Sequence, residues 1–288
     1  MMSKGATYRE LYLACRARLQ RAGVEDPGTD AALLCRHFFS LDRAGLAVHG
    51  EEACPEGLRE KFLQAQEERA GRRPLQYILG QWDFMGLPLK VGEGVLAPRE
   101  DTAALVEAVA ARLPRRKGLY GVDLCAGTGA VALGLCSLCP GVRIDCIELS
   151  EKALFFLREN LASYPQYPIQ ARQGDICSPQ DAQAIGPLDV LVSNPPYIRS
   201  AVLPTLQPEV RREPSMALDG GGDGLGFYRA IAALWLPKLK PGGLVGVEIG
   251  EEQGEAVAGL FRQAGLTGIA VHQDWAGLDR AVTATAQV

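Results

Sequence analysis

The sequence predicts an α/β protein with a parallel sheet in its C-terminal part and a small helical bundle at its N-terminus. After residue 118, short apolar runs rich in β-branched residues alternate with helical stretches. This order is typical of a parallel sheet with right-handed crossovers. Before residue 73 the pattern has only helical periodicity, with no glycine-rich loop and no cluster of acids. We therefore expect two domains of different architecture.

The composition is that of an ordinary globular protein. The 288 residues are 47% hydrophobic and 22% charged, and the formal net charge is −4. This charge argues against a surface that follows long stretches of nucleic-acid backbone. The sequence has no N-terminal apolar segment and no long uncharged apolar run, so we expect a cytoplasmic protein without a signal peptide or membrane span.

The eight cysteines follow no regular spacing, which favours reduced thiols over a disulfide framework. The one Cys-x-x-Cys pair is formed by Cys136 and Cys139, and it has no second pair or histidine at metal-ligand spacing. We interpret this pair as helix packing, and we expect no metal.

Residues 1–72 are predicted to form a helical domain that docks a substrate. Leu11, Cys15 and Leu19 recur every fourth residue, which indicates one buried helix face. Similar segments follow along the chain. We expect helix starts at residues that can cap or open a helix, namely Thr7, Asp30 and Pro55.

Residues 73–100 form the expected boundary between the domains. Here the apolar period changes to two, which is typical of strands. Trp82 and Phe84 precede the turn residues Met85-Gly86, and further alternating apolar residues follow. This pattern predicts a β-hairpin linker.

Residues 101–288 are expected to form the α/β domain. Asp101 or Thr102 can cap its first helix. The expected strands are 121–124, 142–148, 168–173, 188–193 and 244–249.

A glycine-rich turn follows the first of these strands, in Asp123-Leu124-Cys125-Ala126-Gly127-Thr128-Gly129. The two glycines let the backbone turn sharply and approach a ligand with no Cβ in the way. Glu148 ends the next strand, close to the spacing of about 20 residues at which an acid reaches ribose hydroxyls. Asp175 ends the third strand, where it can accept from the exocyclic amine of adenine while Ile176 packs against the ring.

The fourth strand ends in Asn194-Pro195-Pro196-Tyr197. Proline has no backbone N–H, so Pro195 and Pro196 present only carbonyl acceptors around the Asn194 carboxamide. Such a group suits a planar –NH2, and the Tyr197 ring can stack on a planar amide or base. Open α/β sheets bind their ligands at these strand ends.

The glycine turn alone leaves the cofactor open, because Gly127 to Ala132 also fits the loose G-x-G-x-x-A pattern of NAD-binding proteins. Asp123 favours S-adenosylmethionine, since a carboxylate at this point repels a pyrophosphate but suits a cationic methionine end. Methylation of an –NH2 also gives the acceptor cluster at Asn194 a use. The residues expected to bind the cofactor are Asp123, Cys125, Ala126, Gly127, Thr128, Gly129, Glu148, Asp175, Ile176 and Asn194.

Several motifs together resemble the protein-glutamine methyltransferases of peptide-chain release factors, the HemK family of class I S-adenosylmethionine-dependent methyltransferases. The likeness runs from about residue 73 to the C-terminus. The motifs that carry it are Arg73 to Gly80, Leu96 to Thr102, Asp123 to Gly129, Asn194 to Tyr197, Glu213-Pro214 with Ala217 to Gly221, and Asp274 to Arg280. Two departures stand out: Cys125-Ala126 replaces the usual Gly and small residue, and Glu148 replaces the usual Asp.

The resemblance implies a Rossmann-like, seven-stranded, mostly parallel sheet with an antiparallel last strand. It implies methyl transfer to the glutamine of the Gly-Gly-Gln loop of class I release factors, with the helical domain helping to hold that partner. Asn194, Pro195 and Tyr197 are then the candidate catalytic residues, and Pro196 joins them in substrate binding. Because amino-group methyltransferases of DNA adenine or rRNA share Asn-Pro-Pro-Tyr, a nucleic-acid substrate stays an alternative. An NAD-linked oxidoreductase is a more distant one.

Overall fold

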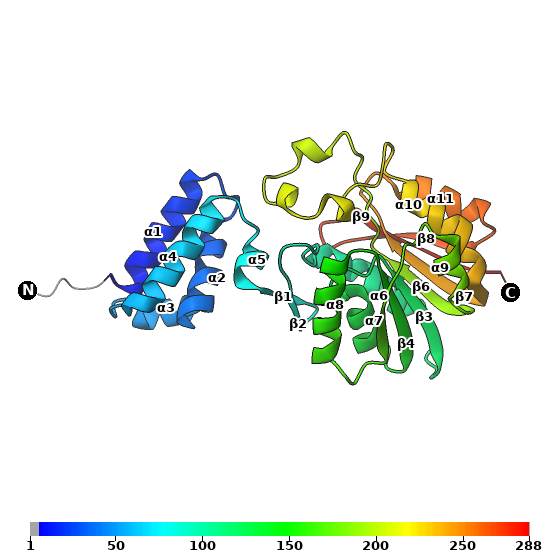
Figure 1. The fold of residues 1–288 in the computed structure, drawn as a ribbon, viewed down its shortest axis with the longest axis horizontal. Helices are drawn as coiled ribbons and strands as arrows, with labels where there is room; N and C mark the ends of the chain where they lie inside the picture. Colours follow the sequence, from blue (N-terminus) through cyan, green and yellow to red (C-terminus); the bar gives the residue numbers. More distant parts are fainter. Residues whose placement is uncertain (1–5, 288) are drawn as a thin grey trace, which may run out of the picture. The chain divides into compact units, whose positions relative to one another are not determined.

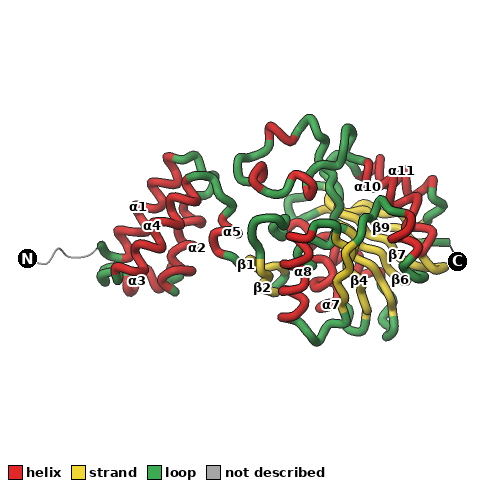
Figure 2. Tube along the Cα trace, in the orientation of Figure 1, coloured by secondary structure: helices red, strands yellow, loops and turns green. Residues whose placement is uncertain are grey.

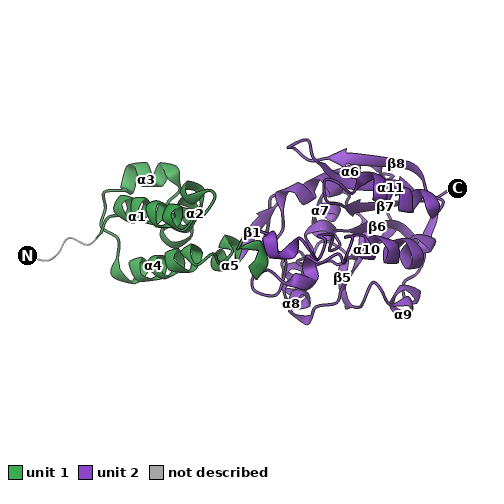
Figure 3. Cartoon of the chain, turned by 90° about the horizontal axis from the view of Figure 1, so that it is seen from above, with its two compact units in different colours: residues 1–80, 207–212 green, residues 81–206, 213–288 purple. Residues whose placement is uncertain are grey.

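The computed structural model describes residues 6–287, and residues 1–5 and 288 of the two expected domains lie outside this range. The chain divides into two compact units (Figure 3). Unit 1 extends to Gly80 and also includes Gln207–Arg212, whereas unit 2 comprises Gln81–Leu206 and Glu213 onward.

Unit 1 is helical. Thr7 caps the first helix as expected, because its side chain accepts from the Glu10 backbone and the Glu10 side chain accepts from the Thr7 backbone. The predicted cap at Asp30 is wrong. Asp26 caps that helix instead, since Pro27 at the first helical position fixes φ and needs no hydrogen-bond partner. The helices are α1 (Tyr8–Arg21), α2 (Pro27–Phe39), α3 (Arg43–His49), α4 (Glu56–Ala70) and α5 (Leu75–Leu79).

Unit 2 begins with the predicted hairpin, formed by β1 (Gln81–Phe84) and β2 (Leu87–Lys90). The two turn residues, Met85 and Gly86, have φ of 54° and 78°. Two successive positive φ values are the geometry that a two-residue hairpin turn requires. The hairpin prediction is confirmed.

The sheet of unit 2 has seven strands in the order β5-β4-β3-β6-β7-β9-β8. All neighbours from β5 to β7 are parallel, while β9 runs antiparallel between β7 and β8. The seven-stranded, mostly parallel sheet with an antiparallel last strand is therefore confirmed. The strands are β3 (Leu119–Leu124), β4 (Val142–Glu148), β5 (Ile169–Gln173), β6 (Leu188–Ser193), β7 (Leu239–Glu248), β8 (Thr267–Gln273) and β9 (Asp279–Thr285).

β7 starts earlier than the predicted residue 244. The run Pro241-Gly242-Gly243 is typical of a turn, but the strand continues through it. Leu239 pairs with Leu188 before a shift in register, and the Gly242 N–H donates to the Ala286 carbonyl at 3.1 Å. Tertiary pairing therefore overrides the local turn preference.

Helices cover both faces of the sheet (Figures 1 and 2). The core on one face is shared with α6, α7 and α8, and the core on the other face is shared with α9, α10 and α11. These helices are α6 (Ala103–Arg112), α7 (Ala130–Leu138), α8 (Glu151–Ser163), α9 (Pro179–Gln183), α10 (Gly226–Ala230) and α11 (Gly254–Gln263). A π-helical turn spans Ile231–Trp235, and 3₁₀ turns span Glu100–Thr102, Leu203–Thr205, Val210–Arg212, Ser215–Ala217 and Leu236–Lys238.

One expected cap in unit 2 is wrong. Thr102 occupies the N-cap position of α6, but its side chain makes no capping hydrogen bond. The short turn Glu100–Thr102 leads into the helix, and the Thr102 hydroxyl has another partner, described below. Within residues 6–287, no helix has the length and apolar character needed to cross a membrane.

Candidate functional site at the carboxyl ends of the strands

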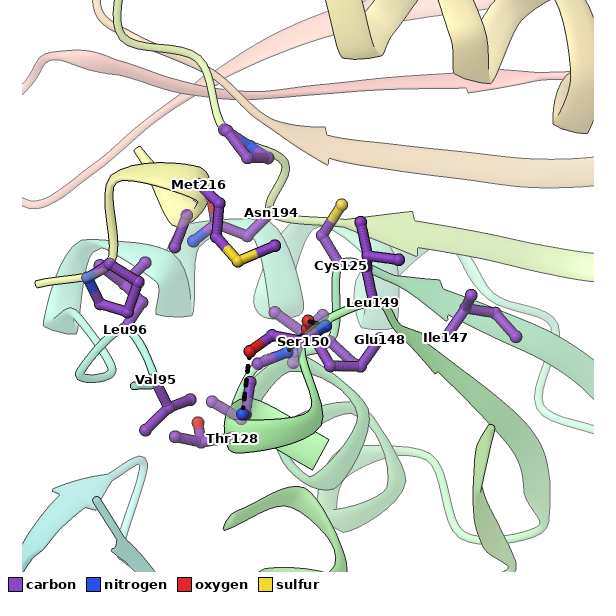
Figure 4. Close-up of a pocket in the computed structure, with 18 of the residues that line it drawn as sticks. Val95, Leu96, Cys125, Thr128, Ile147, Glu148, Leu149, Ser150, Asn194 and Met216 are labelled. Atoms are coloured by element: carbon purple, nitrogen blue, oxygen red, sulfur yellow. Dashed lines mark hydrogen bonds between the residues drawn. The ribbon is translucent and has the colours of Figure 1, made fainter. Parts of the chain in front are cut away.

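Unit 2 contains a cavity of about 350 Å³ at the carboxyl ends of β3, β4 and β6 (Figure 4). Its volume lies in the range of about 300–1,000 Å³ that small-molecule sites usually have. Asn194 and Met216 border it at the top of the view, and Val95 and Thr128 border it at the bottom. The cavity therefore lies where an open α/β sheet places its ligands.

The glycine turn after β3 forms one wall of the cavity. Cys125, Gly127 and Gly129 have φ of 58°, 54° and 82°, all in the left-handed region. This conformation suits glycine, and it strains a side chain such as that of Cys125. A Cβ added to Gly127 would meet only Val95, at 3.9 Å, so the space beside this residue is open.

Glu148 connects the glycine turn to the start of α8. Its Oε2 accepts from the Gly127 N–H and its Oε1 accepts from the Ser150 N–H, both at 2.8 Å. Burial raises the pKa of this carboxyl group, although the backbone N–H groups act in the opposite direction. Each oxygen retains lone pairs that can accept from a ligand hydroxyl.

Asp123 lies at the end of β3 and does not line the cavity. It is 1% exposed, and its Oδ2 accepts from the Ala132 N–H at 3.1 Å. Its Oδ1 is buried without a hydrogen bond among the described residues. Burial, with a smaller contribution from Glu148, raises the pKa of Asp123 to about 8.

Asp175 and Ile176 line the cavity beyond β5. The Asp175 Oδ1 accepts from the Cys177 N–H at 2.8 Å, and its backbone N–H donates to Asp181 at 2.8 Å. The Ile176 carbonyl accepts from the indole N–H of Trp235, also at 2.8 Å. These bonds hold the loop backbone in place and leave the Ile176 side chain to form cavity wall.

Asn194 and Pro196 line the cavity on the side of β6, whereas Pro195 and Tyr197 are not among its lining residues. The Asn194 Nδ2 donates to the Thr102 hydroxyl at 3.3 Å. Because the nitrogen is directed at Thr102, the side-chain oxygen is the atom available to a ligand. The Tyr197 hydroxyl donates to Glu248 at 3.2 Å.

The expected cofactor residues are thus mostly brought together. The cavity is lined by Cys125, Ala126, Gly127, Thr128, Glu148, Asp175, Ile176 and Asn194, whereas Asp123 and Gly129 lie behind this wall. Sequence reasoning did not select Thr102, Met216 and Phe227, which also line it. These residues follow no spacing rule, and only Thr102 carried a signal, through the Leu96 to Thr102 motif.

The charges around the cavity are mainly negative. The lining residues include the carboxylates of Glu148, Asp175 and Asp219, against one cation, Arg99. Arg99 is itself paired with Glu213 at 2.6 Å. Such a surface attracts a cationic ligand and repels a pyrophosphate.

Among the described residues, no group of His, Cys, Asp or Glu could hold a metal ion. The Cys-x-x-Cys pair lies at the end of α7. The Cys136 thiol is buried and donates to the Val142 carbonyl, as helix packing predicts.

Comparisons with known families match both units. The model of the PrmC N-terminal domain matches residues 10–80, and the model of the methyltransferase small domain matches residues 99–223.

Individual relatives agree with these matches. The chain is 41% identical over 268 residues to the release factor glutamine methyltransferase of Moorella thermoacetica, with 91% of this chain and 93% of that protein covered. It is 38% identical over 279 residues to the enzyme of the same name from Geobacter sulfurreducens, covering 96% and 95%. Among solved structures, the Thermus thermophilus 16S rRNA N2 G1207 methyltransferase RsmC, solved with AdoMet and guanosine, has a similar fold. Its TM-score is 0.52 at 18% identity, with 72% of this chain and 50% of that chain covered.

Proposed function

The chain belongs to the release factor glutamine methyltransferase family, and from that premise we propose how its site methylates a glutamine side chain. The enzyme transfers a methyl group to the amide nitrogen of the glutamine in the Gly-Gly-Gln loop of class I peptide-chain release factors. The observation that carries this proposal is the position of Asn194. Its carboxamide borders a cavity rich in carboxylates, and its nitrogen donates to Thr102.

We propose that the cavity binds S-adenosylmethionine. The open space beside Gly127 lets a ligand approach the backbone, and the negative lining suits a sulfonium cation. Glu148 would accept from the ribose hydroxyls. Asp175 and Ile176 would contact the adenine. Asp123 would support the glycine turn from behind, through its bond to the Ala132 N–H, and would carry a negative charge toward the methionine end only as pH approaches 8.

When bound, S-adenosylmethionine supplies an electrophilic methyl group, whose bond to sulfur breaks with its electron pair as the bond to nitrogen forms. The difficulty lies in the amide nitrogen, because its lone pair is delocalised into the carbonyl. The Asn194 Oδ1 and the Pro195 carbonyl would accept hydrogen bonds from the two N–H groups of the glutamine amide and so increase the electron density on its nitrogen. No basic side chain is required, since the proton can leave to water after transfer.

Positioning contributes a further part of the rate enhancement. Holding the amide in line with the methyl group at near-attack distance can supply roughly 7 kcal/mol or more of the barrier. Tyr197 would pack against the plane of the substrate amide. Its hydroxyl is tied to Glu248, which fixes the direction of the ring.

We propose that the helical part of the chain, expected within residues 1–72, contacts the release factor and so presents its loop to the site. Residues 10–80 match the PrmC N-terminal domain model, which supports a role specific to this family. A cytoplasmic location stays a prediction from the sequence.

A methyl-transfer assay with labelled S-adenosylmethionine tests the function. We expect label in a purified class I release factor and none above background in DNA or rRNA. Asn194→Ala should abolish turnover and leave S-adenosylhomocysteine affinity within about twofold in calorimetry, because the substrate acceptor is lost while the glycine turn, Glu148 and Asp175 are unchanged. Label in nucleic acid alone would support the alternative substrate. Equal losses of turnover and cofactor affinity would contradict the role of Asn194.

The choice of cofactor has a separate test. We expect S-adenosylhomocysteine to raise the melting temperature and NADH to leave it unchanged, since only a ligand that binds the folded state stabilises it. Stabilisation by NADH instead would contradict the proposal.

A further inference from the structure

The side chain of Asn194 has two orientations of similar shape, which exchange its oxygen and its nitrogen. Only one orientation presents an acceptor to a substrate –NH2. In the structure, Nδ2 donates to the Thr102 Oγ1 at 3.3 Å. A hydroxyl can both donate and accept, so Thr102 alone does not select this orientation. Something else must fix the direction of the Thr102 proton.

Glu248 is the residue that can fix it. This last residue of β7 is 2% exposed, and its Oε1 accepts from the Tyr197 hydroxyl at 3.2 Å. Its Oε2 is buried and has no hydrogen-bond partner among the described residues. The neighbouring Thr102 hydroxyl lowers the pKa of this carboxyl group, so it is a donor available to the unpaired Oε2. An ionised carboxylate only accepts, so it draws the single Thr102 proton toward itself.

We propose that Glu248 and Thr102 are positioning residues that set the orientation of the Asn194 carboxamide for methyl transfer. With its proton directed at Glu248, the Thr102 oxygen can only accept from Asn194. The Asn194 oxygen then faces the cavity. With a substrate bound, the hydrogen bonds would run in one direction from the substrate –NH2 through Asn194 and Thr102 to Glu248, and such chains polarise each bond along them. This inference rests on the proposed role of Asn194 in accepting the substrate amide.

The groups that face Glu248 determine the pH at which the hydrogen bonds from Asn194 through Thr102 to Glu248 would change direction. Burial raises the pKa of Glu248 to about 7, against the opposing effects of Thr102, Arg280 and Tyr197, while the negative charge of Asp101 raises it further. Tyr228 also faces it, since its hydroxyl donates to the Glu248 backbone carbonyl at 2.8 Å. Arg280 also forms an ion pair with Asp274, at 3.0 Å.

Protonated Glu248 can donate to Thr102, whose own proton then turns toward Asn194 and favours the reversed carboxamide. Turnover should therefore rise with pH through about 7, as Glu248 ionises. A substitution that removes this titration should remove the rise.

Three variants test the relay: Thr102→Val, Thr102→Ser and Glu248→Gln. Valine has the shape of threonine without the hydroxyl, so we expect kcat for release-factor methylation to fall about tenfold or more. S-adenosylhomocysteine affinity should stay within about twofold. Thr102→Ser should restore most of the turnover, because it retains the hydroxyl. Glu248→Gln should lower kcat and lose the rise in kcat near pH 7.

Each outcome decides a different point. Wild-type kcat in Thr102→Val would overturn the relay. A reduced kcat in Thr102→Val together with an unchanged pH profile in Glu248→Gln would remove Glu248 from it. If Glu248→Gln does not fold, comparing kcat of Thr102→Val with kcat of Thr102→Ser still shows whether turnover needs the hydroxyl at position 102. Failure of the wild type to methylate a release factor would instead refute the proposed function.

Discussion

The backbone N–H of Gly127 donates to the Glu148 Oε2 at 2.8 Å. This bond joins the turn after β3 to the end of β4, two segments that parallel pairing places side by side. The Ser150 N–H donates to the other oxygen of the same carboxylate. Glu148 therefore organises the proposed cofactor site as well as facing the ligand.

Glu148→Gln should weaken binding of S-adenosylhomocysteine about ten- to a hundredfold. The glutamine side chain has one oxygen, which can accept from only one of the two backbone N–H groups, and its –NH2 faces the second. A buried donor without a partner costs about 1–3 kcal/mol. Isothermal titration calorimetry measures the affinity. The matched control is Glu151→Gln, which changes an exposed acid at the start of α8. Equal affinities for the two variants would argue against the placement of the ribose at Glu148.

Gly127→Val should remove cofactor binding while the protein stays folded. The added Cβ meets only Val95, at 3.9 Å, so the side chain points into the open cavity and blocks the ligand. The positive φ of 54° adds strain of about 1–2 kcal/mol. Calorimetry gives the affinity, and thermal melting shows that the variant folds. A folded variant with near-normal affinity would show that the ligand binds elsewhere.

Asp123→Asn should change how stability depends on pH. Burial raises the pKa of Asp123 from 3.8 to about 8 in the folded state. The contribution of this group is therefore fully favourable below about pH 4 and is lost as pH rises toward 8. Asparagine has no such titration and retains an oxygen for the Ala132 N–H. Relative to the wild type, the variant should gain stability across this window in urea unfolding. A difference that stays constant with pH would refute the raised pKa.

Arg69→Met should destabilise the protein by about 3–5 kcal/mol. Arg69 is 8% exposed within unit 1 and pairs with Asp30 at 2.6 Å and with Glu209 at 2.7 Å. Its removal leaves two largely buried carboxylates without this partner. Arg18→Met is the control, because Arg18 makes a solvent-exposed pair with Glu67 and should cost about 1 kcal/mol or less. Similar losses in urea unfolding would contradict this prediction.

Local sequence patterns predicted most elements of the sheet. Runs such as Leu188–Ser193 and Val142–Glu148 are β-branched and buried, and the structure has them as strands with the same bounds. The turn at Met85-Gly86 is also correct, because its chemistry is local. The cap of α2 is different: Asp26 and Asp30 are both suitable caps, and only the fixed φ of Pro27 decides between them.

Long-range contacts were not predictable in the same way. Thr102 looks like a helix cap, yet its hydroxyl accepts from Asn194, 92 residues away. Glu248 ends an apolar strand and gives no local sign that it lies beside Tyr197. Glu209 accepts a hydrogen bond from Arg69, which lies 140 residues earlier in the sequence. A single sequence has no periodicity that encodes such pairs, since they depend on how the chain closes in three dimensions.

Peptide mass spectrometry of a purified class I release factor, after incubation with the enzyme and S-adenosylmethionine, shows whether the glutamine is methylated. We predict one added methyl group, located on the side-chain nitrogen of the Gly-Gly-Gln glutamine, and no added methyl group with Asn194→Ala. A release factor that stays unmodified, or that carries the methyl group on another residue, would contradict the account.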